Sequence, residues 1–402
     1  MTKNRRLGDS LLEAGEKTHG RIRLFFLKSG MDMPFLIILL AILAIGLVSL
    51  YSASYAYAYH YTGNSYQFIT KQLMFAAVGL FFMFAASTID YHVLHKAAWP
   101  VLGLAVVLLI IVFFIPSESG IRRWIGPIPI IGQFQPSEVA KFAEILIFAH
   151  LISINYKRMK YFKYGFLPFI VLLVGVAGLV FVEPHLSGAI LLLSIGMIMM
   201  YVGGTRMVYL VVTVILGLAA VAAMVFLKGY EIDRIMVWND PVGVFESSEP
   251  LPNGQAGRDA AWQTVQSLYA IGSGGLMGQG LGNSRQKHLF LPEPQNDFIF
   301  AVVCEELGFV GAVVIIILFA LLVWRGIVIA MRAPDKFGSM LALGLTLQVG
   351  IQVALNLAVV TNTILNTGIS LPFFSYGGTA LVMLLAQMGL VLAVSRHTKK
   401  DQ

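Results

Sequence analysis

Long apolar runs alternate with short polar segments along almost the whole chain. Each run has roughly 18 or more residues, which is the length that a helix needs to cross a bilayer. The pattern therefore predicts an all-α polytopic membrane protein, with about ten transmembrane helices in a single domain over residues 33–396. The expected spans are 34–54, 69–88, 98–115, 136–155, 164–182, 186–203, 206–227, 298–324, 338–360 and 377–395.

The composition agrees, because 57% of the residues are hydrophobic and only 12% are charged, against about 25% in soluble domains. Lys and Arg gather in a tail over residues 1–32, in the loops that follow even-numbered spans, and in a tail over residues 397–402. Positively charged loops stay on the cytoplasmic side of a membrane, so we expect both tails to be cytoplasmic. The net charge of +7 then reflects membrane orientation and does not indicate a nucleic-acid partner.

The loop from 228 to 297 is about 70 residues long, and the same topology makes it extracellular. Loops of this length are usually functional or disordered. Its middle, 246–259, is rich in Ser, Pro, Gly and acidic residues and is expected to be flexible, whereas 260–270 predicts a helix. The glycine-rich turn over 274–282 lacks the strand and helix that flank a dinucleotide-binding loop. We expect its glycines to let backbone segments pack closely, with a phosphate-binding nest as the alternative.

Three charged residues, Glu138, Lys141 and Glu144, follow one another at helical spacing inside the fourth span. Charges in lipid are costly and usually pair or mark functional sites, so we favour a functional role over a purely structural ion pair. Arg122 and Arg123 precede this span. They suit either an interfacial anchor or a clamp for the diphosphate of a lipid, because guanidinium groups bind phosphate in a bidentate manner.

Two other polar segments lie at turns that we expect to be extracellular. The segment Glu183-Pro184-His185 joins the fifth and sixth spans, and its side chains suit solvent and a cavity equally well. Ser375 and Tyr376 offer hydroxyl groups just before the tenth span, and the glycines that follow them are expected to serve helix packing. The single cysteine, Cys304, lies in an apolar run, which leaves no disulfide framework and no Cys-based metal site.

Asp297 ends the long loop and directly precedes the eighth span. Pro292 and Pro294 prevent a helix before it, so we expect Asp297 to be the N-cap of a helix that starts at the next residue. The helix dipole would then lower its pKa and keep the carboxylate ionised. Of the two acids within the span, Glu305 is the better placed to share a cavity with Asp297. Glu306 points to nearly the opposite face and is expected to be structural.

Together these segments resemble the SEDS family (shape, elongation, division and sporulation proteins), which includes FtsW, RodA and SpoVE. In chain order the matching pieces are RRWIGP followed by QPSEVAKFA, then EPHLSGA, then QSLYAIGSGGLMGQGLG through DFIFAVVCEELGFVG, and NTGISLPFFSYGGT. They span most of the chain. EPHLSG resembles the division and sporulation branch, since the elongation branch typically has aspartate where His185 stands, and the long basic tail also suits FtsW. Leu365 departs from the family pattern, which usually has proline at this position near the ninth span.

The resemblance implies a multi-pass peptidoglycan glycosyltransferase in the cytoplasmic membrane of a bacterium. Such an enzyme polymerises lipid II and works with a class b penicillin-binding protein, which is a transpeptidase, and with other division proteins. The family's essential acid corresponds to Asp297. It would act as the base that activates the C4 hydroxyl of one sugar for attack on C1 of another, with release of undecaprenyl diphosphate.

We expect the substrate-binding residues to be charged and polar groups around this acid. Arg122, Arg123 and Lys287 are the candidates for the diphosphate, and the others are expected to line the cavity. The sequence contains no visible metal-ligand cluster, although a divalent cation, Mg²⁺ or Mn²⁺, could assist at the diphosphate. The expected site consists of Asp297 with Arg122, Arg123, Trp124, Glu138, Lys141, Glu183, Lys287 and Ser375.

Two other functions stay open at the level of the sequence. A lipid II flippase or another transporter would also carry charges within broken helices, but it has no need of an acid confined to the extracellular face. The third interpretation is a non-catalytic scaffold that recruits a transpeptidase.

Overall fold

The computed structural model of the protein describes residues 30–115, 123–128, 132–183, 186–228, 232–247, 249–252 and 254–397. Apart from residues 30–32 and 397, the two predicted tails lie outside these residues. Nearly all of the described chain is helical, which confirms the predicted fold class. The long helices are α2 (Met33–Thr62), α3 (Gln67–Thr88), α4 (His92–Phe114), α5 (Pro136–Asn155), α6 (Leu167–Val182), α7 (Leu186–Gly203), α8 (Met207–Lys228), α12 (Ile299–Arg332), α13 (Lys336–Val360) and α14 (Gly378–His397).

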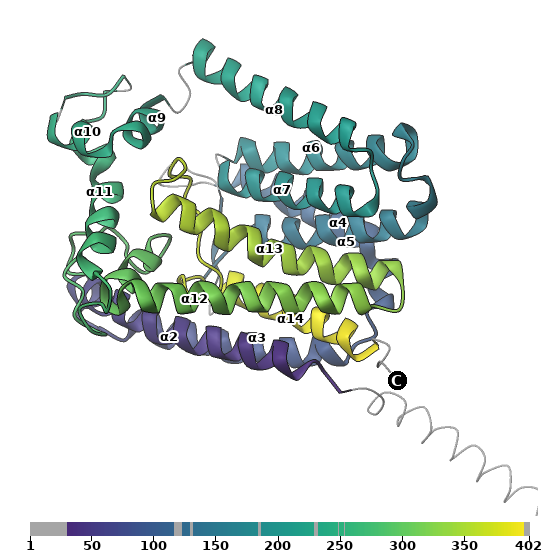
Figure 1. The fold of residues 1–402 in the computed structure, drawn as a ribbon, viewed down its shortest axis with the longest axis horizontal. Helices are drawn as coiled ribbons and strands as arrows, with labels where there is room; N and C mark the ends of the chain where they lie inside the picture. The colour runs from purple at the N-terminus through teal and green to yellow at the C-terminus, as the bar shows by residue number, and fades with distance from the viewer. Residues whose placement is uncertain are drawn as a thin grey trace, which may run out of the picture.

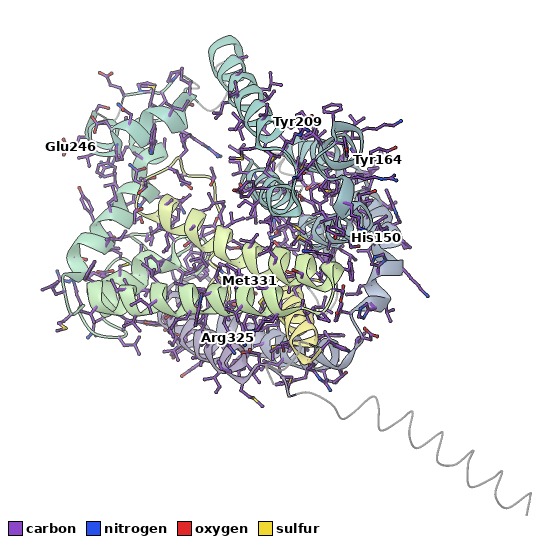
Figure 2. The ribbon with its side chains drawn as sticks, turned by 45° about the vertical axis from the view of Figure 1, so that its right-hand side comes forward. His150, Tyr164, Tyr209, Glu246, Arg325 and Met331 are labelled. Atoms are coloured by element: carbon purple, nitrogen blue, oxygen red, sulfur yellow. The ribbon has the colours of Figure 1, made fainter. Side chains whose placement is uncertain are left out.

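The long helices form a bundle, and three further helices gather at one end of it (Figure 1), which we call the α11 end. Figure 2 shows Glu246, which lies on one of these three helices, on the side of the molecule away from His150 and Tyr164. A 3-10 turn and a π-helical turn connect α5 to α6 at the opposite end. The three helices are α9 (Ile232–Asn239), α10 (Pro241–Ser247) and α11 (Gly257–Gly274), and the two turns are Tyr156–Arg158 and Phe162–Phe166.

Every predicted span coincides with one of the long helices. Among the described residues, eight helices are long and apolar enough to cross a membrane, namely α2, α3, α4, α6 with the turn before it, α7, α12, α13 and α14. The other two predicted spans are α5 and α8. Helix α5 carries three charged residues, Glu138, Lys141 and Glu144, and the apolar stretch of α8 covers Met207–Ala219.

Local sequence explains where several helices begin and end. The Asp32 carboxylate accepts a hydrogen bond from Phe35 N at 3.0 Å at the start of α2, and Asp335 accepts one from Gly338 N at 2.9 Å at the start of α13. Such side-chain caps satisfy backbone N–H groups that have no partner within the helix. At its other end α2 stops at Gly63, whose φ of 70° lies in the left-handed region that glycine adopts without strain.

Helix α13 lies in the middle of the bundle, where it packs against α5, α7 and α12, while α14 lies along α3. Small residues allow these close approaches. Gly344 of α13 faces Ile145 and Met199, and a Cβ atom at Gly389 of α14 would collide with the backbone of Met83. This is the packing expected of helices in lipid, where association depends on van der Waals fit between small residues.

A short hairpin precedes α5 and is the exception to the helical fold. Strand β1 (Ile125–Ile128) pairs antiparallel with β2 (Gly132–Phe134), so that Ile125 lies opposite Phe134. The sequence did not predict it, because prolines within IGPIPIIGQF argue against a strand. The hairpin holds the residues on either side of it close to the first turn of α5.

The long loop is more ordered than expected. Val237, Leu251, Ala261 and Val265 form a small apolar core of their own. Gly257 N also donates a hydrogen bond to Glu249 O at 2.8 Å. Of these four residues Leu251 lies within 246–259, the segment that was predicted to be flexible, so the core places the described part of this segment against α11. The predicted helix over 260–270 is confirmed as part of α11.

Helix α12 is broken one third of the way along, at Gly308, whose φ is 66° and ψ is −170°. The glycine-rich turn inserts its own backbone at this break. Gln279 N and Gly280 N donate to Glu305 O and Glu306 O at 2.9 and 3.0 Å, while Phe309 N donates to Gly275 O at 2.9 Å. A Cβ atom at Gly278 would collide with the carbonyl of Glu306. The expectation that these glycines serve close backbone packing is confirmed.

Replacing Gly278 by alanine is expected to destabilise the protein by at least about 2 kcal/mol, because the new methyl group collides with backbone and the residue is held in the left-handed region. The temperature midpoint of unfolding, followed by size-exclusion chromatography of heated samples in detergent, measures this. Gly272→Ala is the matched control, since it lies in α11 with open space around it and alanine favours helix. Equal midpoints for the two variants would contradict the role given to Gly278.

Candidate functional site

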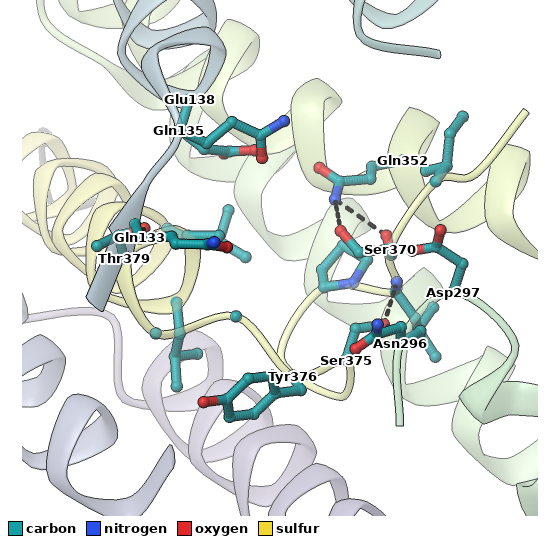
Figure 3. Close-up of a pocket in the computed structure, with 18 of the residues that line it drawn as sticks. Gln133, Gln135, Glu138, Asn296, Asp297, Gln352, Ser370, Ser375, Tyr376 and Thr379 are labelled. Atoms are coloured by element: carbon teal, nitrogen blue, oxygen red, sulfur yellow. Dashed lines mark hydrogen bonds between the residues drawn. The ribbon is translucent and has the colours of Figure 1, made fainter. Parts of the chain in front are cut away.

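A cavity of about 790 Å³ lies where the hairpin, α5, α7 and α13 meet the loops on either side of them. Figure 3 shows Gln135 and Glu138 on one side of this cavity and Asp297 on the other. The polar residues that line it come from positions far apart in the sequence. They are Lys71, Arg123, Gln133, Gln135, Glu138, Lys141, Ser187, Asn296, Asp297, Gln352, Ser370, Ser375, Tyr376 and Thr379.

Most of the predicted site residues meet at this cavity. Arg123, Trp124, Glu138, Lys141, Asp297 and Ser375 all line it. Arg122 and His185 lie outside the described residues. Glu183 and Lys287 are described but do not line the cavity.

Asp297 is half-buried on the cavity wall. Its backbone carbonyl accepts a hydrogen bond from Asn356 Nδ2 at 2.7 Å, and the same nitrogen donates to Ile369 O at 2.6 Å. Gly368 has a φ of 69°, and a Cβ atom there would lie 3.2 Å from the Asp297 carboxylate. The loop between α13 and α14 therefore approaches the acid closely, and Asn356 holds the two together.

The prediction that Asp297 caps α12 is wrong. The helix begins at Ile299, Phe298 takes the capping position, and no side chain caps the first turn. Burial and, to a smaller extent, the negative charge of Glu293 raise the pKa of Asp297, the positive charge of Arg123 opposes them, and the result is a pKa of about 6. The expected lowering by the helix dipole is thus replaced by a raised pKa, because removal of the carboxylate from water outweighs its favourable neighbour.

Arg123 lies within electrostatic reach of two acids. Its charge opposes the effect of burial at Asp297 and also at Glu183, which follows α6 and is fully buried. Burial raises the pKa of Glu183 to about 8, and Arg123 lowers this pKa. Glu183 therefore acts on the site through Arg123 and does not form part of the cavity wall.

Glu138 and Lys141 form an ion pair on the cavity wall, with 2.8 Å between Glu138 Oε1 and Lys141 Nζ. The third member of the predicted ladder, Glu144, lies one turn deeper and is buried. Neither of its carboxylate oxygens has a hydrogen-bond partner among the described residues. The carboxylate packs against Gly196 of α7, so the ladder consists of one pair and one separate acid.

Ser375 shapes the wall through hydrogen bonds to the backbone. Its hydroxyl donates to Asn296 O and accepts from Leu371 N, both at 2.8 Å, and Tyr376 N donates to Gln295 O at 2.8 Å. These bonds pin the loop after α13 onto the loop before α12 (Figure 3). Because the hydroxyl is occupied in this way, Ser375 positions the wall around Asn296 and Asp297.

Lys287 does not have the geometry expected of a diphosphate ligand. It is fully buried, its ammonium group lies 2.6 Å from Glu306 Oε1, and it donates to Ser52 Oγ at 3.2 Å. The same nitrogen lies 4.8 Å from the centre of the Tyr55 ring. An ammonium group paired in this way is not available to a ligand in the cavity. Its partner Glu306 is structural, as predicted.

Glu305 was expected to share a cavity with Asp297, and this expectation is also wrong. Its carboxylate accepts hydrogen bonds from Arg285 N at 2.9 Å and Gln286 N at 3.3 Å, and from the hydroxyl of Ser284. The acid points at residues 284–286, which follow the glycine-rich turn, and fastens this segment to α12. Both glutamates of the eighth span therefore hold the loop that leads to Asp297.

Several lining residues were missed by the sequence-based reasoning. Lys71 is the only charged residue of the second predicted span, 69–88. A single charge in an otherwise apolar span is the signal that could have identified it. Gln352 donates to Ser370 O at 3.0 Å and lies on α13 between Gln348 and Asn356, each four residues away. A polar stripe at this spacing on an apolar helix predicts an inward-facing polar surface.

Among the described residues, no group of three or more His, Cys, Asp or Glu side chains is placed to hold a metal ion. Mg²⁺ commonly uses one or two carboxylates together with substrate phosphates, and Glu138 and Asp297 are the two carboxylates on the cavity wall. The donor set is therefore compatible with a divalent cation that arrives with a phosphorylated ligand.

Two substitutions are expected to shift the pKa of Asp297 in opposite directions. Arg123→Gln removes the positive charge that favours ionisation, so the pKa rises above about 6. Glu293→Gln removes a negative charge that opposes ionisation, so the pKa falls. Infrared difference spectra of the carboxylate band against pH, with Asp297→Asn as the reference that lacks the band, give both values. A shift of the same sign in both variants would contradict this electrostatic arrangement.

The chain is similar to known proteins over most of its length. A family model described as cell cycle protein, covering FtsW, RodA and SpoVE, matches residues 33–400. The stage V sporulation protein E of Bacillus subtilis (strain 168) is 38% identical over 382 residues, which cover 92% of this chain and 99% of that protein. The probable peptidoglycan glycosyltransferase FtsW of Geobacter sp. (strain M18) is 35% identical over 374 residues, covering 92% and 98%.

Two solved structures share the fold. The crystal structure of the Thermus thermophilus rod shape determining protein RodA has a TM-score of 0.65 at 27% identity and covers 92% of this chain and 98% of that chain. A chain from work on the structural coordination of polymerization and crosslinking by a peptidoglycan synthase complex has a TM-score of 0.72 at 26% identity, covering 92% and 99%.

Proposed function

The chain belongs to the cell cycle protein family of FtsW, RodA and SpoVE, and we propose that it is a peptidoglycan glycosyltransferase that polymerises lipid II. The observation that carries this proposal is a half-buried carboxylate with a pKa of about 6, Asp297, on the wall of a large cavity that also holds Arg123 and Lys71. A general base works best when its pKa lies near the operating pH. Cationic side chains in the same cavity suit a diphosphate leaving group.

The proposed reaction is a single displacement. Asp297 takes the proton of the C4 hydroxyl on one lipid-linked sugar as that oxygen bonds to C1 of the other. The bond between C1 and the diphosphate oxygen breaks, and undecaprenyl diphosphate leaves with the electron pair. Attack opposite the leaving group converts an α-linked donor into a β-linked product without a covalent enzyme intermediate. One carboxylate suffices as the base, because cationic groups stabilise the departing diphosphate in place of an acid.

Arg123 and Lys71 are the proposed diphosphate ligands, with Arg122 as a third and Trp124 beside them. Lys71 replaces Lys287 in this role because Lys71 lines the cavity and is exposed to it. The Glu138–Lys141 pair lines the wall as a polar, nearly neutral unit. A Mg²⁺ or Mn²⁺ ion that arrives with the diphosphate would be held by its oxygens and by Glu138 Oε2, since Oε1 is paired with Lys141, and it would stabilise the charge of the leaving group.

We place the protein in the cytoplasmic membrane of a bacterium, with the α11 end outside and both termini in the cytoplasm. The basic residues Lys157, Arg158, Lys160 and Lys163 support this orientation, because they lie between α5 and α6 at the end opposite to α11. The proposed partners are lipid II, membrane lipid, a class b penicillin-binding transpeptidase and other division proteins. The similarity to a chain of a peptidoglycan synthase complex supports a crosslinking partner.

A role in cell division is proposed over one in elongation. The segment EPHLSG supports a role in division or sporulation, as do 38% identity to a stage V sporulation protein and 35% identity to a protein named as FtsW. The long basic N-terminal tail supports division. Depletion of the protein in its host, followed by microscopy, tests this role, with filaments expected for a division protein and rounded cells for an elongation protein.

Asp297→Asn is expected to lower lipid II polymerisation by the purified protein, supplied with its transpeptidase partner, by at least about 100-fold. The amide has nearly the same shape but cannot accept the proton, and general-base catalysis typically contributes 10²- to 10⁴-fold. Gel separation of the glycan products measures the loss. Glu249→Gln removes an exposed carboxylate from the same long loop and is the matched control.

Normal glycan chains from the Asp297→Asn protein would contradict the assignment of the base. Movement of lipid II across vesicles without polymer would favour the transporter. Rescue of cell growth by an Asp297→Ala protein would favour the scaffold.

The rate of polymerisation is expected to rise with pH through about 6, because Asp297 must be ionised to accept the proton and its pKa has that value. Below this pH the carboxyl group is protonated and the rate falls about tenfold for each pH unit. In Arg123→Gln the midpoint moves to higher pH, whereas in Glu293→Gln it moves to lower pH. Initial rates between pH 5 and pH 8 test this. If the midpoint of the pH–rate profile is the same in both variants as in the parent, Asp297 is not the titrating group.

A further inference from the structure

A second hollow, of about 380 Å³, opens between α11 and the loop that leads to α12. Asp259, Trp262 and Gln263 of α11 form one side of it, and Pro292 and Glu293 form the other. Its volume lies in the range of roughly 300–1,000 Å³ that is usual for small-ligand sites. We infer that this hollow is a saccharide-binding subsite that holds part of the glycan outside the main cavity.

Trp262 provides a fixed apolar surface in this hollow. Its indole Nε1 donates a hydrogen bond to Phe290 O at 2.6 Å, and its ring packs against Phe245 with 5.7 Å between the ring centres. Because the only polar atom of the indole is already bonded, Trp262 offers a ligand only the part of its aromatic surface that Phe245 and Arg258 leave uncovered. The C–H face of a pyranose ring is the kind of surface that packs on an aromatic ring in this manner.

The polar groups of the hollow are mainly acceptors. Asp259 is exposed, and its carboxylate can accept hydrogen bonds from hydroxyl groups. Glu293 uses Oε2 to accept from Asn296 Nδ2 at 2.8 Å, and a carboxylate has further lone pairs that can accept from a ligand. An apolar ring beside two carboxylates matches a sugar, which presents C–H groups on its face and hydroxyl donors around its rim.

A neutral ligand fits the hollow better than a strongly cationic one. The guanidinium of Arg258 lies 5.7 Å from the centre of the Trp262 ring and 5.2 Å from that of Phe245. This cation stands over the aromatic side of the hollow and adds a positive charge there, which offsets part of the negative charge of the lining. A hydroxyl-rich saccharide uses the remaining acceptors without needing a net negative site.

The hollow and the main cavity are separated by a wall that is one side chain thick. Asn296 lines the main cavity and bonds Glu293, which lines the hollow. Gln263 of the hollow accepts from Asn366 Nδ2 at 3.5 Å, at the start of the loop whose residues 368–377 line the main cavity. A chain of sugars that extends from the cavity past Asn296 would reach the hollow directly. The identity of the sugar rests on the proposed function, whose product is a glycan.

The test is calorimetric binding of a soluble, lipid-free tetrasaccharide of alternating N-acetylglucosamine and N-acetylmuramic acid, with its lactyl carboxyl groups converted to amides so that the ligand is neutral. The full-length Asp297→Asn protein in nanodiscs is used, so that no turnover takes place. Trp262→Ala and Asp259→Asn are each expected to weaken binding roughly tenfold, the effect of one lost contact of this kind. Trp262→Phe, which keeps an aromatic surface, is expected to retain most of the affinity. Glu246→Gln removes a carboxylate from the same region outside the hollow and is expected to bind as the parent does.

Equal affinity in the parent, Trp262→Ala and Asp259→Asn would overturn the inference. It would also fall if the free stem peptide, with its amino groups, bound at the hollow and the tetrasaccharide did not. Binding is measured without catalysis, so a failure of the proposed function does not affect it. Tetrasaccharide binding that depends on Trp262 in a protein found unable to polymerise lipid II would leave the subsite standing and remove the proposed reaction.

Discussion

The architecture around the cavity depends on an exchange of backbone hydrogen bonds between two glycine positions. Helix α12 breaks at Gly308, and the freed groups on either side of the break bond to residues 275–280. In a membrane protein each unpaired backbone group within the apolar region costs several kcal/mol, so a broken helix persists only where another segment completes its bonds. The absence of side chains at Gly278 and Gly308 is what allows the two backbones to come so close.

Charge reinforces this junction. The pair of Lys287 and Glu306, with Ser52 and Tyr55 around the ammonium group, holds the loop against α2 and α12. A buried pair gains little over apolar packing, but removing one partner leaves an uncompensated charge, at a cost of about 3–5 kcal/mol. The carboxylate of Glu305 also holds residues 284–286 against α12, by accepting hydrogen bonds from two backbone N–H groups and from the hydroxyl of Ser284. The loop that ends at Asp297 is thus fixed by hydrogen bonds at its beginning and by Asn356 and Ser375 at its end.

The helices could be predicted from the sequence because the bilayer sets their length, so each apolar run of sufficient length became a helix. Asp297 could be predicted from its motif and its place at the end of the long loop. The direction of its pKa shift could not, because it depends on burial and on Arg123, which is remote in sequence. The prediction that Lys287 binds the diphosphate was wrong for a similar reason, because its environment depends on a residue that is not its neighbour in sequence. Its partner Glu306 lies beyond a loop and a helix turn, although the cost of burying either charge alone would have suggested that they pair.

The side-chain amide of Asn356 ties the segment that holds Asp297 to the loop after α13. Both bonds of Asn356 Nδ2 reach backbone carbonyls, one at Asp297 and one at Ile369. Neither loop can move away from α13 without breaking a bond to the same nitrogen. The segments before α12 and after α13 therefore open and close as one cooperative unit, and slow hydrogen exchange in one implies slow exchange in the other. A signal that loosens the loop after α13 would reach the acid through this nitrogen.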